Sequence, residues 1–354
     1  MPAAKDSIER AVLAPSAALS QDSSATDRWK AWDEFLEATP EAGFMQTSWW
    51  ADLRSTAGYD HFAAILKNHG AILGGAVVLK YYPTPESCFY YIPDGPVLPA
   101  DEPAAAEVFA ALLNAIEDER KSERLPISHL RIEPRWARLP SFVSGFRARP
   151  VLGDAYMEPR DTLCVDLRPT EAEILAQMKP KGRYNIRVAQ KHCVTIFEET
   201  LEKGVAEFLA IYGETASRHG LNAKPPDYFQ DIVTLLAPLQ RCALFFAEHE
   251  GVRLAAALII YFGRRATYFF GGSLPTRRHV MAPHLLHFEI MRDAKARGHQ
   301  WYDFWGIAPD NDPNHPWWDI TVFKRKFGGA EFNLVRTADY VFDAASYDAY
   351  LSRK

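Results

Sequence analysis

Residues 301–329 have the sequence WYDFWGIAPDNDPNHPWWDITVFKRKFGG, and this stretch decides how the rest of the chain is interpreted. An apolar, aromatic strand is predicted over 301–305 and ends at Gly306. A loop rich in Pro, Asn and Asp follows, and three consecutive cations then precede a double glycine. Loops of this length inside compact domains usually carry function. The pattern indicates a site for a large, aromatic or phosphorylated ligand. The alternative is a surface loop whose Trp side chains cap a core.

Length and composition describe an ordinary globular chain. Its 354 residues predict about two domains, and 48% hydrophobic with 24% charged residues is typical of soluble proteins. A net charge of -5 means that any contact with nucleic acid must be local. The sequence contains no run of 18 apolar residues and no signal-peptide pattern, so we expect a cytoplasmic protein.

The cysteines predict a reduced protein without a metal site. The four residues are Cys88, Cys164, Cys193 and Cys242. They are far apart in the chain, lack the spacing of metal ligands and occupy apolar or strand-like contexts. We therefore expect buried thiols in a reducing compartment.

The order of predicted elements repeats along the chain. In the first half it comprises strands at 61–66, 72–82 and 88–92, a helix at 103–120 and a strand at 129–132. In the second half it comprises strands at 244–247, 254–262 and 266–270, a helix at 283–297 and a strand at 300–305. Aligning Gly70 on Gly251 also superimposes the small residues 74–76 on 255–257. The repeat predicts two similar α/β domains produced by internal duplication.

We expect residues 1–26 to be a flexible extension, because they are rich in Ala, Ser and Asp. The first domain is predicted over 27–165 together with 336–354, and the second over 166–335. The C-terminal segment is assigned to the first domain because a strand is predicted over 334–342, after the second repeat is complete.

The element order matches the acetyltransferase-like (GNAT) fold. An enzyme of that fold that uses acyl-CoA needs a glycine-rich turn whose backbone N–H groups bind the pyrophosphate. At the corresponding point the second half has Val280 where the glycine is needed, and a side chain there would crowd the phosphate. The first half has Asp101 and Glu102, which would repel it. Neither half is predicted to bind CoA.

Several motifs, in order, resemble those of the FemABX family. They are FxQTxxWxxxR over 44–54, YIPDGPV over 91–97, MKPKGRYNIRxAxKxxV over 178–194, YDFWG over 302–306 and FKxxFG over 323–328. The resemblance covers about residues 28–345 and departs from the usual pattern at Asp94, where an arginine is expected. The family's long coiled-coil insertion has no counterpart here. The resemblance implies the compact type: two tandem GNAT-like domains without a coiled-coil arm.

The family resemblance also implies an activity. Its members are non-ribosomal aminoacyltransferases that move an amino acid from aminoacyl-tRNA onto the stem-peptide amine of a peptidoglycan precursor, building the interpeptide bridge. The acceptor is UDP-MurNAc-pentapeptide or lipid II. A lipid-linked acceptor would bring the protein to the inner face of the membrane. Aminoacyl-tRNA is then a co-substrate, and no cofactor is expected.

The resemblance assigns the chemistry to Lys324, whose cation would stabilise the oxyanion or bind the tRNA acceptor end. The alternative is a solvated lysine in a basic run. Substrate binding is assigned by the same resemblance to Arg54, Tyr91, Lys224, Tyr228, Tyr268, Phe270 and Phe323. Arg54 and Lys224 would meet the acceptor's phosphates, although a lysine lacks the two-pronged geometry of arginine. Each aromatic residue is also compatible with a place in a core.

Contact with tRNA phosphates is predicted on a basic helix and beside Lys324. The residues are Lys179, Lys181, Arg183, Arg187, Lys191, Arg325 and Lys326. Arg183, Arg187 and Lys191 are spaced to project from one helix face, where like charges repel unless a polyanion binds. A solvated face is the alternative. Two other functions stay open: an acyl-CoA-dependent N-acyltransferase, which the missing glycines oppose, and a non-catalytic tandem-GNAT binding protein.

Overall fold

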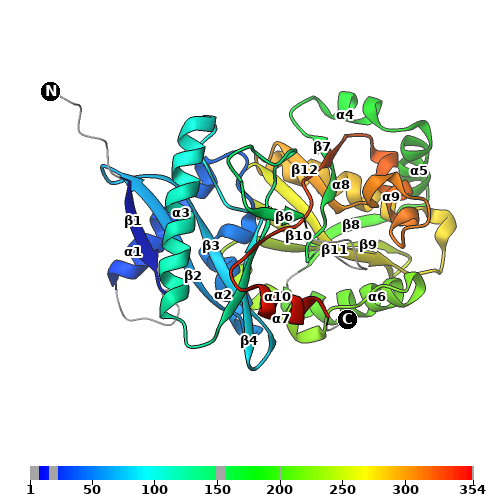
Figure 1. The fold of residues 1–354 in the computed structure, drawn as a ribbon. Coiled ribbons are helices and arrows are strands. Elements are labelled where there is room, and N and C mark those ends of the chain that lie inside the picture. Colours follow the sequence, from blue (N-terminus) through cyan, green and yellow to red (C-terminus); the bar gives the residue numbers. More distant parts are fainter. Residues whose placement is uncertain (1–7, 16–22, 149–156, 200, 353–354) are drawn as a thin grey trace. The chain divides into compact units, whose positions relative to one another are not determined.

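The computed structural model describes residues 8–15, 23–148, 157–199 and 201–352 (Figure 1). The chain divides into two compact units, residues 1–158 with 334–354 and residues 159–333. Each unit is built on a seven-stranded mixed sheet. Both units have the GNAT-like α/β architecture that the element order predicts.

The sheet of the first unit has the order β1-β2-β3-β4-β5-β14-β6. Its strands are β1 (Glu9–Leu13), β2 (Asp60–Asn68), β3 (Ala71–Thr84), β4 (Ser87–Pro93), β5 (Ile127–Glu133), β6 (Phe146–Ala148) and β14 (Ala338–Val341). Its helices are α1 (Ser23–Ala38), η2 (Phe44–Gln46), α2 (Ser48–Thr56), α3 (Glu102–Ser122) and α10 (Ala344–Leu351). Asp101 caps α3 by accepting a hydrogen bond from Ala104 N at 3.1 Å. The helix buries Val108, Leu112 and Ile116 and lies along β1–β3 (Figure 1).

The sheet of the second unit has the order β13-β7-β12-β11-β10-β9-β8. Its strands are β7 (Asp161–Asp166), β8 (Thr195–Glu199), β9 (Cys242–His249), β10 (Val252–Phe262), β11 (Arg265–Ser273), β12 (Trp301–Gly306) and β13 (Ala330–Asn333). Its helices are α4 (Glu171–Gln177), α5 (Pro180–Lys191), α6 (Leu201–His219), α7 (Pro226–Leu236), η3 (Arg278–Val280), α8 (Ala282–Ala296), η4 (Pro309–Asn311), α9 (Trp318–Lys324) and η5 (Arg325–Phe327). Helix α8 packs on β8, β9 and β10 and on α5.

Each sheet contains one strand that lies outside its own repeat in the sequence. Strand β14 follows the second unit along the chain, yet it pairs with β5 and β6 of the first sheet. Strand β7 follows β6 along the chain, yet it pairs with β12 and β13 of the second sheet. The predicted domain boundary at 165/166 is therefore misplaced. A first domain that ends at residue 165 includes most of β7, whose hydrogen bonds belong to the second sheet.

Two further expectations need correction. Residues 9–13, predicted as part of a flexible extension, form β1 and pair with β2 at the edge of the first sheet; residues 1–7 and 16–22 of that extension lie outside the described residues. Cys193 is exposed, unlike Cys88, Cys164 and Cys242, which are buried as predicted. It follows the C-terminus of α5 with a positive φ of 54°, in a turn that directs its side chain outward. Within the described residues, no helix has both the length and the apolar character needed to cross a membrane.

Candidate functional site

The central strands of the second sheet separate after a short pairing. β11 and β12 run parallel and pair at Arg265–Trp301, Ala266–Tyr302 and Thr267–Asp303 only. Beyond this point β12 also changes register against β7, between Asp303 and Gly306. Trp305, inside this irregularity, has a positive φ of 60°. The bulge redirects the end of β12 and leaves two strand ends that do not pair with each other.

The side chain of Lys324 reaches the point where these strands diverge. Its Nζ donates a hydrogen bond of 2.6 Å to the carbonyl oxygen of Gly306 on β12. The same atom lies 5.7 Å from the ring centroid of Tyr268, the first residue of β11 beyond the paired segment. Lys324 is only 5% exposed. The alternative of a solvated lysine in a basic run is therefore wrong.

Helix α9 holds Lys324 in place through a second contact with the end of β12. The hydroxyl of Thr321 accepts a hydrogen bond of 2.7 Å from Ala308 N and donates one of 2.8 Å to Trp317 O. Thr321 and Lys324 are one helical turn apart and face the same way. Both anchor α9 on the segment that follows the bulge, so the position of the amine depends on the course of β12.

Burial gives the amine an unusual protonation equilibrium. Burial lowers the pKa of Lys324 to about 7, and the nearby Asp303 carboxylate opposes this shift. Burial also lowers the pKa of His287 well below its usual value, with a further lowering from Lys324. Perturbed groups of this kind cluster at functional sites. Near neutral pH, a negative charge developing or binding at this point favours the protonated amine.

Aromatic rings surround the buried amine. His287 on α8 lies 4.5 Å from the Tyr268 ring and 5.5 Å from the Phe323 ring, measured between centroids. Its Nδ1 is 2.8 Å from the hydroxyl of Tyr302. Phe323 is partly buried against the same core. The structure thus brings together three predicted site residues, Lys324, Tyr268 and Phe323, in an apolar environment.

Three other predicted substrate residues form a second group, on α7, the segment before it and β11. Lys224 is exposed, and its Nζ lies 5.7 Å from the ring centroid of Tyr228. Tyr228 in turn packs edge to face on Phe270, with centroids 6.0 Å apart. A backbone hydrogen bond of 3.2 Å from Lys224 N to the hydroxyl of Tyr212 fixes this turn. A cation beside partly exposed rings suits an anionic, partly apolar ligand.

The two remaining substrate residues lie in the first unit and differ from each other. Arg54 is partly exposed, and its guanidinium lies 4.3 Å from the ring centroid of Tyr59. Tyr91 is 3% exposed, and its hydroxyl donates to Glu133 at 2.7 Å. Glu133 also accepts hydrogen bonds from Thr337 at 2.6 Å and from Met157 N at 3.0 Å. These contacts indicate that Tyr91 has a structural role.

Most of the predicted tRNA-binding cations are solvated. Lys179, Lys181, Arg187 and Lys191 are exposed on or beside α5. Lys181 lies 5.1 Å from the ring centroid of Tyr184, which is itself 57% exposed. On this helix Arg183 differs, because its guanidinium donates to the carbonyl oxygens of Ala176, at 3.3 Å, and Met178. It satisfies the C-terminal carbonyls of α4, so its guanidinium does not project with the cations predicted on the same helix face.

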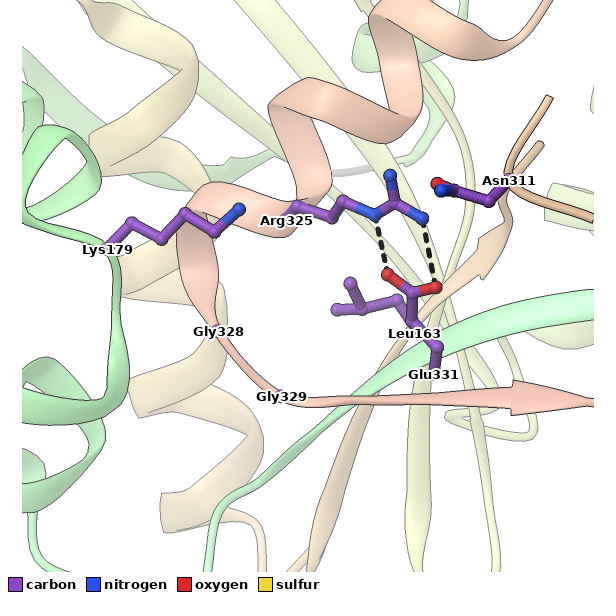
Figure 2. A pocket seen from close by; sticks show the side chains of 7 residues that line it. All are labelled: Leu163, Lys179, Asn311, Arg325, Gly328, Gly329 and Glu331. Atoms are coloured by element: carbon purple, nitrogen blue, oxygen red, sulfur yellow. Dashed lines mark hydrogen bonds and ion pairs between the residues drawn. The ribbon is translucent and has the colours of Figure 1, made fainter. Parts of the chain in front are cut away.

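An open pocket of about 550 Å³ lies beside the end of α9. It is lined by Leu163, Lys179, Asn311, Arg325, Gly328, Gly329 and Glu331. Figure 2 shows Lys179 and Asn311 on either side of the ion pair between Arg325 and Glu331, whose closest atoms are 2.5 Å apart. This pairing occupies the Arg325 guanidinium, so the solvated cation of the pocket is Lys179. The neighbouring Lys326 is partly buried, and burial lowers its pKa.

The FemAB family matches residues 28–137, 145–248 and 240–351, which together span most of the chain. The chain belongs to the FemAB family. The resemblance drawn from its motifs is thereby confirmed.

Among relatives of this FemAB protein is the lipid II:glycine glycyltransferase of Staphylococcus epidermidis, 21% identical over 382 residues that cover 89% of this chain and 92% of that protein. The enzyme of the same name from Staphylococcus saprophyticus is 21% identical and covers 90% and 92%. The crystal structure of FemX has a TM-score of 0.82 at 19% identity and covers 91% of this chain and 98% of that one. L-PGS from Bacillus licheniformis has a TM-score of 0.52 at 13% identity, covering 96% and 97%. These likenesses show the fold.

The functional prediction missed the residues behind Lys324 in this FemAB protein. Asp303, Thr162 and Arg265 surround the bulge of β12 and were not proposed as site residues. A signal for Asp303 was present, since it is a charged residue in the middle of the apolar strand predicted at 301–305. The sequence contains no comparable signal for Thr162 or Arg265, because their proximity depends on the pairing of β7 and β11 with β12.

Proposed function

We propose that this FemAB transferase moves an aminoacyl group from aminoacyl-tRNA onto the stem-peptide amine of a peptidoglycan precursor. The observation that carries the proposal is the buried amine of Lys324, held where β11 and β12 diverge. Family membership and the names of the glycyltransferase relatives support the substrate class. Those names favour lipid II as acceptor and glycine as the donated residue, with UDP-MurNAc-pentapeptide as the other acceptor to test.

The reaction is the aminolysis of an ester. The acceptor amine attacks the carbonyl carbon of the aminoacyl ester, so that a C–N bond forms and the carbonyl oxygen becomes an oxyanion. The C–O bond to the tRNA ribose then breaks, and the proton lost by the amine ends on the ribose hydroxyl. The developing oxyanion is the charge that an enzyme must stabilise most strongly. Holding the two substrates together supplies much of the remaining acceleration.

Lys324 is suited to stabilising that oxyanion. Its ammonium form is a strong hydrogen-bond donor in an apolar site, where a charge interaction is stronger than in water. Because its pKa is about 7, the protonated form is favoured further as negative charge develops beside it. Gly306 already accepts one of its hydrogens, which leaves two for substrate oxygens.

Separate parts of the two units fit the two substrates. The solvated cations Lys181, Arg187 and Lys191 on α5 suit tRNA phosphates, with Lys179 in the adjacent pocket. In the second unit Lys224, beside the ring of Tyr228, suits the acceptor's phosphates. In the first unit Arg54, beside the ring of Tyr59, is a separate cation that also suits a phosphate. A lipid-linked acceptor would bring these surfaces to the inner face of the membrane.

The deciding experiment incubates the protein with tRNAs charged with glycine, alanine or serine and with each precursor, and measures the product by mass. We expect one residue mass to be added to a precursor, with no product from uncharged tRNA plus free amino acid. The absence of product from every pair would overturn the proposal.

A second measurement separates this function from acyl-CoA chemistry. Val280, at the position where a CoA-binding turn needs glycine, is fully buried in the core, so its side chain cannot move aside for a phosphate. Acetyl-CoA at submillimolar concentration is therefore expected to leave the melting temperature unchanged. A clear upward shift would instead favour an acyl-CoA-dependent enzyme.

A further inference from the structure

The buried carboxylate of Asp303 is the element of the site that the proposed mechanism has not used. The residue is fully buried in the middle of β12. Its Oδ1 accepts hydrogen bonds from the hydroxyl of Thr162 and, at 2.9 Å, from Trp305 N. Its Oδ2 lies 3.6 Å from the Arg265 guanidinium. Placing a charged carboxylate in a core is unfavourable unless such partners compensate for the lost hydration.

Resting on the proposed function, we propose that Asp303 is a positioning residue for the transfer reaction. It fixes the bulge of β12 that directs the Gly306 carbonyl toward Lys324, and its charge favours the ammonium form of the Lys324 amine. Asp303 itself does not touch the substrates. It acts through Lys324, and Thr162 acts through Asp303.

The geometric part of the proposal follows from hydrogen bonds at two adjacent residues of β12. Asp303 binds Trp305 N, at the residue whose φ of 60° turns the strand. The next residue, Gly306, is the acceptor for Lys324 Nζ. Gly306 is also tightly enclosed, because a Cβ there would lie 2.9 Å from the rings of Pro159 and Trp317. Loss of the hydrogen bond to Trp305 N would therefore displace the Gly306 carbonyl, to which the amine donates.

The electrostatic part depends on which charges face the amine. Among the described residues, the titratable groups around Lys324 and Asp303 are Arg265 and Tyr268 on β11, His287 on α8, Tyr302 on β12 and Cys164 on β7. Burial lowers the pKa of His287 and raises those of Tyr268 and Tyr302, so these three are neutral near pH 7. Asp303 is the carboxylate of this set. Its removal leaves Lys324 with no carboxylate to offset its burial.

The test compares Asp303→Asn with Asp161→Asn. Asparagine keeps an oxygen for Trp305 N and Thr162 but removes the charge. Asp161 is a matched control, because it is 2% exposed on the neighbouring β7 and pairs with Arg160 at 2.6 Å. The Lys324 amine is followed by ¹⁵N-lysine NMR without substrates, its signal assigned from the spectrum of Lys324→Met. We expect Asp303→Asn to lower the pKa of Lys324 by about one unit and Asp161→Asn to leave it unchanged.

Kinetics then test the link to catalysis. The descending alkaline limb of kcat should move to lower pH by the same amount in Asp303→Asn, with kcat at pH 7.5 reduced about tenfold and KM for the precursor unchanged. In a Lys324→Met background, Asp303→Asn should cause little further loss, because its effect passes through Lys324. Thr162→Val keeps the charge but removes the hydroxyl, so it should reduce kcat a few-fold without moving the pKa of Lys324.

The outcomes separate this inference from the proposed function. Wild-type protein that transfers nothing would overturn the function, whereas the NMR titration of Lys324 needs no substrate. Equal pKa values of Lys324 in Asp303→Asn and Asp161→Asn would overturn the electrostatic role. Full additivity of Asp303→Asn with Lys324→Met, or an unchanged kcat in Thr162→Val, would overturn the positioning role.

Discussion

The two units each bury a charged side chain on the equivalent strand of their sheets and surround it differently. β5 and β12 occupy equivalent places in the two sheet orders. Strand β5 buries Arg131, and β12 buries Asp303. In the first unit β4 and β5 stay paired to their ends, through Ile92–Ile132 and Pro93–Glu133. In the second unit the pairing of β11 and β12 ends at Thr267–Asp303.

The partners of the two charges explain this difference. The Arg131 guanidinium donates to both carboxylate oxygens of Asp339, at 2.8 and 2.7 Å, and to the Tyr350 hydroxyl at 3.0 Å. These contacts hold the guanidinium within the sheet and against α10. The Asp303 carboxylate instead accepts a hydrogen bond from Trp305 N in the bulge of β12, and its charge opposes the lowering of the Lys324 pKa. One architecture thus carries a structural ion pair in one copy and, in the other, the site that we propose for transfer.

Breaking the ion pair of the first unit should cause the largest loss of unfolding free energy. Arg131→Met leaves the fully buried Asp339 carboxylate without its guanidinium, which typically costs about 3–5 kcal/mol of unfolding free energy. Chemical denaturation measures the loss. Transfer activity per folded molecule should be unchanged, because Arg131 is in the unit whose central strands remain closed.

Arg120→Met is the control for this substitution. Arg120 pairs with Glu117 at 2.7 Å on the surface of α3, where an ion pair contributes about 0.2–1 kcal/mol. Similar losses of unfolding free energy in Arg131→Met and Arg120→Met would mean that the buried pair of Arg131 and Asp339 is not a structural ion pair.

The chemical side of the comparison is tested by Lys324→Met. Methionine fills a similar volume but has no donor for an oxyanion, so kcat should fall by about 10²-fold or more. Affinity for the precursor should change little, since we assign ground-state binding of its phosphates to other cations, Arg54 and Lys224. Steady-state kinetics with charged tRNA give both quantities. Lys326→Met is the matched control, and a loss as large as that of Lys324→Met would reduce Lys324 to one member of a basic patch.

The fold was largely predictable because its signals are local. Alternating apolar runs, turns at Gly70 and Gly251, and the periodicity of the long helices gave the order of both repeats. The placement of β14 in the first sheet was predicted, because its residues follow the completed second repeat. The placement of β7 in the second sheet was not predicted. Each strand is a short apolar segment, and only its long-range hydrogen bonds show which sheet it joins.

The site could be predicted only where a recognisable motif contains a side chain with a chemical function. Lys324 stood out through its motif, and the structure adds that it is buried and held by Gly306. Arg183 was misjudged because helical spacing gives the face of a side chain but not its partner, here the carbonyls of α4. The bulge at Trp305 had no sequence signal, since positive φ was adopted by a bulky residue rather than glycine.

The burial of Lys324 should also appear in the pH dependence of stability. The pKa of its amine is about 7 in the folded protein and about 10.4 when unfolded. Between these values the unfolded state binds more protons, so stability should rise with pH from 7 to 10. Methionine removes this penalty. Lys324→Met should therefore be more stable than wild type by roughly 1–3 kcal/mol at pH 6.5, after allowing for the lost hydrogen bond to Gly306.

This advantage should shrink as pH rises and disappear by about pH 10. Denaturation curves at pH 6.5 and 9.5 measure the change. Lys191→Met provides the baseline, because its side chain is exposed at the end of α5. A stability advantage of Lys324→Met that is independent of pH would show that burial does not shift the pKa of the Lys324 amine. Electrostatics would then not distinguish the site of the second unit from the ion pair of the first.

The smallest expected effect is on the binding of charged tRNA by the exposed cations of α5. Arg187→Gln and Lys191→Gln each remove one exposed cation from α5 and should raise the apparent KM for charged tRNA a few-fold at low salt. Each should also reduce the slope of log affinity against log salt by about 1, because one phosphate contact is lost. Lys121→Gln on α3 of the first unit is the control and should change neither quantity.

Arg183→Gln should lower stability instead, since its guanidinium binds the carbonyls of α4. If Arg183→Gln reduced the salt slope as Arg187→Gln does, the guanidinium would have to leave those carbonyls when tRNA binds, and the exposed face would extend to the N-terminal half of α5.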